Sequence, residues 1–98
     1  MKVFAVAMAE VQDGGSVICC SDAFFDWNDA VDVADGFMTG RVGDFYKIGS
    51  GDWEARRAKV EERVQRKTYA LKGDRKLECH YKAEGLVVAT SVQETEII

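Results

Sequence analysis

The sequence contains no proline, one histidine (His80) and three cysteines (Cys19, Cys20 and Cys79) in 98 residues. The absence of proline argues against a linker or a disordered tail. An odd number of cysteines, two of them adjacent, is a poor basis for a disulfide framework, so we interpret them as reduced thiols of a cytosolic protein. No stretch approaches the ~18 apolar residues of a membrane span, and we expect no membrane association.

Positive charge is missing from most of the first half of the chain. Between Lys2 and Arg41 there is no lysine or arginine, and residues 1–40 carry one cation against seven acids. The rest of the chain carries twelve cations against ten acids, so the net charge of −4 hides a segregation. The apolar fraction of 47% is enough for one modest core, and we expect a single domain over residues 1–98.

Alternating apolar residues and turn signals predict two β-hairpins, over about residues 3–20 and 77–92. In the first strand Phe4, Val6 and Met8 share one face, and small residues share the other. This pattern fits a central strand covered on both sides, or one whose alanine face lets a helix approach closely. The glycines that follow Gln12 and Asp13 predict the first turn.

Apolar residues at helical spacing predict two helices, over about residues 26–38 and 53–71. Asp26 can cap the first helix, with Ser21 as an alternative start, and Gly36 or Gly40 can end it. A short strand over residues 45–48 is a further option. The predicted fold class is therefore α+β with the order ββα(β)αββ, in which two antiparallel hairpins form one sheet and both helices pack on it.

Aspartate recurs at every third position of the first predicted helix. The row predicts an acidic face opposite the apolar one, formed by Asp26, Asp29, Asp32 and Asp35. A solvated polar face is the ordinary interpretation. The functional one is a face that docks on a basic surface of another protein. Calcium binding is disfavoured because the carboxylates are expected on a helix, not at the set positions of a binding loop.

The second predicted helix carries cations at similar spacing. Five of them are expected within one sector of about 100°, namely Arg56, Lys59, Arg63, Arg66 and Lys67. Such a face can follow the phosphates of a nucleic acid. It can equally be a solvated face with i,i+4 ion pairs, or it can pair with the acidic helix within one chain or in a homodimer. The overall acidity of the chain makes nucleic acid the less favoured partner.

Few residues offer catalytic or metal-binding chemistry. Cys19, Cys20, Cys79 and His80 lack the two-residue gap of a zinc knuckle. Neighbours on a strand face opposite sides, so we expect no metal site and no cofactor. A cysteine–histidine nucleophile would need Cys19 or Cys20 beside His80, together with an orienting group. We therefore expect a protein that is not an enzyme.

Four of the ten aromatic residues lie between positions 24 and 37. Core packing is the ordinary role of such a cluster. Phe24 and Phe25 are adjacent and cannot both face the core, so we expect at least one of them to face outward. We assign Phe25 to the acidic face, where an exposed aromatic side chain would serve as an interface anchor.

In its small size, acidic charge and lack of catalytic motifs, the chain resembles the short proteins that phages use to bind and block host machinery, anti-CRISPR inhibitors among them. This resemblance implies a protein-binding module that inhibits its target. Our leading hypothesis is such a module, in which the four aspartates and Phe25 engage a basic protein surface. The alternative is a nucleic-acid-binding regulator that uses the cations of the second predicted helix.

Overall fold

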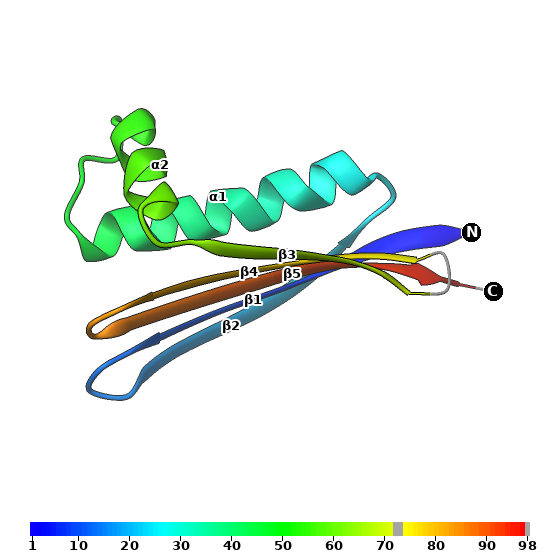
Figure 1. The fold of residues 1–98 in the computed structure, drawn as a ribbon, viewed down its shortest axis with the longest axis horizontal. Coiled ribbons are helices and arrows are strands. Elements are labelled where there is room, and N and C mark those ends of the chain that lie inside the picture. The colour runs from blue at the N-terminus through cyan, green and yellow to red at the C-terminus, as the bar shows by residue number, and fades with distance from the viewer. Residues whose placement is uncertain (72–73, 98) are drawn as a thin grey trace.

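The computed structural model describes residues 1–71 and 74–97, and they form one open sheet with two helices on one side of it (Figure 1). The elements in chain order are β1 (Lys2–Gln12), β2 (Ser16–Phe24), α1 (Trp27–Phe45), α2 (Trp53–Glu61), β3 (Gln65–Leu71), β4 (Asp74–Ala83) and β5 (Leu86–Glu96). Neighbouring strands are antiparallel in the order β2-β1-β5-β4-β3. The predicted α+β class is confirmed, and the predicted order of elements roughly fits.

The first hairpin forms where the turn signal placed it. Gly14 and Gly15 adopt positive φ angles of 97° and 90°, a backbone conformation that costs glycine little and other residues more. β2 then pairs with β1 without interruption from Ser16 to Phe24. Both hairpins are longer than predicted, because strand pairing continues through polar residues that alternation alone does not mark.

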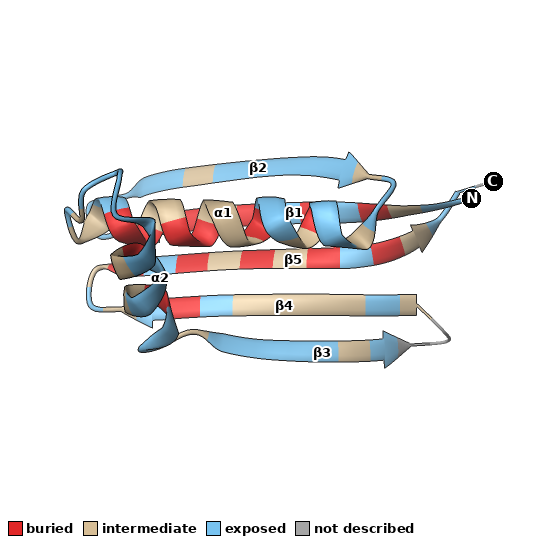
Figure 2. Cartoon of the chain, turned by 90° about the horizontal axis from the view of Figure 1, so that it is seen from above, coloured by how far each residue is buried: buried red, intermediate tan, exposed pale blue. Residues whose placement is uncertain are grey.

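The core lies between the helices and one face of the sheet. Phe4, Val6 and Met8 of β1 pack with Ala30 and Ala34 of α1. The small side chains of the two alanines let the helix approach the sheet closely, and α1 lies over β1 and β5 (Figure 2). A second cluster lies under α2 and the end of α1, and it consists of Met38, Val42, Val60, Tyr81, Leu86 and Val88.

α1 extends to Phe45, and the prediction that it ends near residue 38 is wrong. Gly36 and Gly40 lie inside the helix instead of ending it. Each glycine costs a helix only about 1 kcal/mol, which tertiary packing can offset. The optional strand over residues 45–48 is also wrong, since Phe45 is the last helical residue and Tyr46 caps the helix.

α2 ends at Glu61, so the prediction of a helix over residues 53–71 is wrong in its second half. Its N-terminal cap is Asp52, whose carboxylate accepts the N–H of Ala55 at 3.1 Å. Residues 65–71 form β3 and pair with β4 from Gln65 to Leu71. The extra strand therefore follows the second helix. The ladder of backbone hydrogen bonds with β4 outweighs the helix propensity of this charged segment.

Candidate functional site

The four aspartates of the predicted acidic face have different environments. Asp26 is the N-cap of α1, and its carboxylate accepts the N–H of Asn28 at 3.4 Å. Asp29 and Asp32 are exposed to solvent. Asp35 is half-buried and forms an ion pair with Arg57 of α2 at 3.1 Å. A step of three residues turns a helix by about 300°, so the row winds from the solvent side toward α2.

Asp29 and Asp32 are therefore the open part of the row. Neither carboxylate has an ion-pair partner among residues 1–71 and 74–97. Asp29 lies in the first turn of α1, where the positive end of the helix dipole favours a negative charge. The dipole offsets part of the repulsion between the two carboxylates, which lie three residues apart on the helix.

Phe25 lies in the connection between β2 and α1 and is 77% exposed. Its neighbours turn inward: Phe24 and Trp27 pack against the first core cluster. Trp27 meets Phe4 edge to face at 5.8 Å, and the Arg75 guanidinium covers the indole at 4.4 Å. The prediction that one member of the phenylalanine pair faces outward is confirmed, and the exposed ring directly precedes the acidic end of α1.

The structure does not bring the five predicted cations onto one helical face. Arg56 and Lys59 belong to α2, Arg63 follows its end, and Arg66 and Lys67 lie on β3. The register with β4 places Arg66 opposite Cys79 and Lys67 opposite Glu78. Arg66 and Lys67 are therefore on opposite faces of the sheet. The predicted basic stripe is wrong because the helix that was to carry it ends before Arg63.

Arg56 is buried, with 5% of its surface exposed. Its guanidinium donates to the carbonyl oxygens of Gly40, Ile48 and Gly49 and forms an ion pair with Asp44 at 2.9 Å. It thus joins the end of α1 and the following loop to α2, and it cannot reach a phosphate. No pattern in the sequence indicates this structural role, because it depends on a contact between two helices.

Several of the other cations are already paired within the chain. Lys59 pairs with Glu62 at 3.2 Å, and Arg66 forms two hydrogen bonds with Glu61. The Glu61 carboxylate raises the pKa of Arg66, and Arg66 lowers the pKa of Glu61. These pairs reduce the positive field that a nucleic acid would meet, so no observation favours the nucleic-acid alternative.

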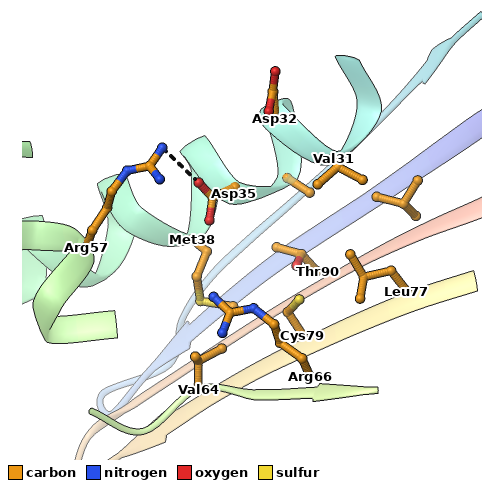
Figure 3. A pocket seen from close by; sticks show the side chains of 12 residues that line it. Val31, Asp32, Asp35, Met38, Arg57, Val64, Arg66, Leu77, Cys79 and Thr90 are labelled. Atoms are coloured by element: carbon orange, nitrogen blue, oxygen red, sulfur yellow. Dashed lines mark ion pairs between the residues drawn. The ribbon is translucent and has the colours of Figure 1, made fainter. Parts of the chain in front are cut away.

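A cavity of about 150 Å³ opens between α1, α2 and the inner faces of β3, β4 and β5. Apolar side chains such as Val31, Leu77 and Val64 line it, and so do the paired side chains of Arg57 and Asp35 (Figure 3). The Cys79 thiol faces this cavity, and burial raises its pKa. The thiol therefore stays protonated at neutral pH and is a weak nucleophile.

The cysteines and the histidine do not meet in one site. Cys79 and His80 are neighbours on β4 and face opposite sides of the sheet, Cys79 toward α1 and His80 toward solvent. Cys19 shares the face of His80, but Ala9 of β1 and Ala89 of β5 separate them in the sheet. Within residues 1–71 and 74–97, no three histidine, cysteine or acidic side chains gather as metal ligands would.

The sheet face away from the helices carries unusually small side chains. We call this the open face. Its residues on β1, β2 and β5 include Ala5, Ala7, Ala9, Cys19, Ser21, Ala23, Ala89 and Ser91. Two adjoining hollows of about 380 and 490 Å³ lie over them and share Ala7 and Ser91. The first strand was predicted either to be covered on both faces or to meet a helix with its alanine face. Neither prediction holds, because α1 covers the face with the large side chains and nothing in the described chain covers the alanines.

A comparison with protein-family models, with curated proteins and with solved structures finds no match to this chain. In the part of the chain that the structure describes, neither helix has the length and apolar character needed to cross a membrane.

Proposed function

We propose that the protein is a non-enzymatic protein-binding module that engages a basic surface of another protein. The observation that carries the proposal is the combination of Phe25, 77% exposed, with the two exposed carboxylates Asp29 and Asp32 on the adjoining first turns of α1. An aromatic ring supplies apolar contact area at a small cost in side-chain entropy, and the carboxylates favour a cationic partner.

The contacts of the four aspartates within the chain support an interface at the start of α1. Asp35 is satisfied by Arg57 and Asp26 serves as a helix cap, so we narrow the proposed interface to Phe25, Asp29 and Asp32. We include in the proposal that binding inhibits the partner, as the chain's size and acidity led us to expect. We also propose a cytoplasmic location, which the free thiols Cys19, Cys20 and Cys79 support.

The test is affinity capture from the cell of origin with three forms of the protein. D29K/D32K reverses the two proposed contacts. E54K/E84K is the matched control, since it reverses two exposed acids elsewhere and also removes a first-turn acid, Glu54 of α2. We expect the wild type and the control to retain a partner that D29K/D32K loses, and raised salt should release it.

F25A separates the apolar contribution to the affinity for the partner from the electrostatic contribution. We expect it to weaken the same complex while leaving the salt dependence of the remaining affinity unchanged. Circular dichroism checks that every variant is folded. If D29K/D32K and the wild type capture the same proteins with the same strength, the proposed interface is wrong.

A further inference from the structure

The two edges of the sheet differ in how they are protected. Both edge strands present a row of unpaired backbone N–H and C=O groups to a neighbour, and β2 and β3 lie along opposite borders of the sheet (Figure 2). β3 carries Arg66 and Lys67 in its first half, and charged side chains on an edge strand are a common way to block strand addition. β2 has no lysine, arginine or proline, and Asp22 is its one charged residue.

β2 is also regular and accessible. All nine of its residues pair with β1 in an unbroken antiparallel register, so no bulge distorts its outer side. α1 lies over β1 and β5 and makes few contacts with β2. Cys20 and Asp22 are exposed on the helix side, and Cys19, Ser21 and Ala23 are exposed on the open face. No described part of the chain shields this edge.

We propose that β2 pairs antiparallel with β2 of a second copy, so that two chains form one continuous sheet. The centre of the strand is Cys20, and a two-fold axis at this residue pairs every position of β2 with a position of the other copy. The facing pairs are then Ser16–Phe24, Val17–Ala23, Ile18–Asp22, Cys19–Ser21 and Cys20–Cys20.

Three features favour a second copy as the occupant. The strands match in length by symmetry, so no backbone group of either β2 remains unpaired along the interface. The two Asp22 carboxylates face Ile18 and not each other, which avoids like charges directly opposite. On the open face, Cys19, Ser21 and Ala23 continue the floor of small side chains from one copy into the other. A closed two-fold interface is also the commonest way in which identical chains associate.

In the alternative arrangement, β2 of one copy lies against β3 of the next, and Asp22 then shares its side of the sheet with Arg66 of that strand. That contact is heterologous, so it would continue into a filament instead of closing.

The two arrangements differ in the size of the assembly that they form. Light scattering during size-exclusion chromatography should show a reversible exchange between monomer and dimer as concentration rises, with no larger species. A monomer at every concentration, or a ladder of higher oligomers, would overturn the proposal.

The axis at Cys20 gives a register-specific crosslink. Directly opposed residues of antiparallel strands have Cα atoms about 4.5–5.5 Å apart, which lies within the range for a disulfide. The Cys19 residues of the two copies are not directly opposed, because each faces Ser21. Diamide accepts the two hydrogen atoms of two thiols as the disulfide forms, so it serves as the oxidant.

Two single-cysteine chains make the matched comparison. C19S/C79S keeps Cys20, and C20S/C79S keeps Cys19. Both cysteines are exposed, so the oxidant can reach each of them. We expect rapid covalent dimerisation of the Cys20 chain and slow reaction of the Cys19 chain. Equal rates for the two chains would contradict the register.

Charged pairs test the same register without oxidation. Positions 19 and 21 are exposed, and their neighbours on β1 are Ala9 and Ala7, so new charges there face only alanine within one chain. C19K/S21K places lysine opposite lysine twice across the interface, and we expect the dissociation constant to rise about tenfold. C19K/S21E places lysine opposite glutamate and should dimerise at least as well as the wild type. If both variants behave alike, the interface lies elsewhere. These measurements involve no other protein, so they are independent of the proposed acidic interface.

Discussion

The side chain of Arg56 lies directly against the backbone of Gly43. A methyl group built on Gly43 would lie 2.5 Å from the Arg56 Cγ and 2.6 Å from its Cδ. Arg56 cannot move aside freely, since its guanidinium donates to carbonyl oxygens of Gly40, Ile48 and Gly49. The absence of a side chain at Gly43 is therefore what allows the end of α1 and α2 to pack this closely.

We expect G43A to destabilise the protein, although alanine favours helix formation. The clash should cost about 2–3 kcal/mol, and the gain in helix propensity returns about 1 kcal/mol of it. G36A is the matched control, because Gly36 is in the same helix and a Cβ there meets nothing within 4 Å. Chemical denaturation should show a lower free energy of unfolding for G43A and a higher one for G36A. Equal effects of the two substitutions would mean that the contact with Arg56 is not a constraint.

The parts of the fold that the sequence predicted are those with local causes. The turn glycines Gly14 and Gly15 and the alternation in residues 3–9 define the first hairpin, and Asp26 caps α1 as expected. The errors have non-local causes. Gly36 and Gly40 suggest helix ends in the sequence, whereas in the structure both lie inside α1, and the nearby Gly43 gives Arg56 of α2 room to pack. Residues 65–71 have helix-forming side chains and become a strand because β4 is available to pair with them.

In the candidate site, too, the features with local causes could be predicted from the sequence and those with non-local causes could not. The exposure of Phe25, Asp29 and Asp32 follows from their spacing relative to the apolar residues, and the sequence predicts it. The pairing of Asp35 with Arg57 and the burial of Arg56 depend on how α2 packs against α1. The open face had a visible sign, the alanines of the first strand, but the side that α1 would cover could not be deduced from one strand alone.

Thr39 offers a prediction of increased stability. It is buried in α1, and its hydroxyl is the one buried side-chain polar atom without a hydrogen-bond partner in the part of the chain that the structure describes. Valine has nearly the same shape and needs no partner, so T39V should raise the free energy of unfolding by about 1 kcal/mol. T39S keeps the hydroxyl, loses the methyl group and should lower it. A less stable T39V would indicate that the hydroxyl is satisfied, for example by a water molecule.

Glu94 of β5 links stability to pH. Its carboxylate accepts the N–H of Arg75 at 3.0 Å and pairs with Lys2 at 3.1 Å, and these contacts lower the pKa of Glu94 from its ordinary value of 4.5. A carboxylate with a lowered folded-state pKa stabilises the fold above its unfolded-state pKa, and this contribution is lost as the pH falls through the folded-state value. We therefore expect stability to decline below about pH 4.5.

E94Q removes this titration. We expect it to be less stable than the wild type at neutral pH and to lose less stability on acidification, so that the two thermal melting temperatures converge at low pH. E84Q is the control, because Glu84 is exposed in the turn between β4 and β5, and its melting temperature should follow that of the wild type. A constant difference between E94Q and the wild type across the acid range would mean that the carboxylate charge is not the source of the effect.

Glu10 and Arg41 form the most buried ion pair of the described residues. The Glu10 side chain is 2% exposed, and one of its oxygens accepts two hydrogen bonds from Arg41, at 2.7 and 3.0 Å. R41M would leave a buried carboxylate without its cation, and we expect the free energy of unfolding to fall by about 3 kcal/mol. E10Q/R41M removes the charge as well and should recover part of the loss, so the two substitutions should not be additive in a double-mutant cycle. Additive effects in urea denaturation would show that solvent already satisfies Glu10 and that this pair does not hold α1 against β1.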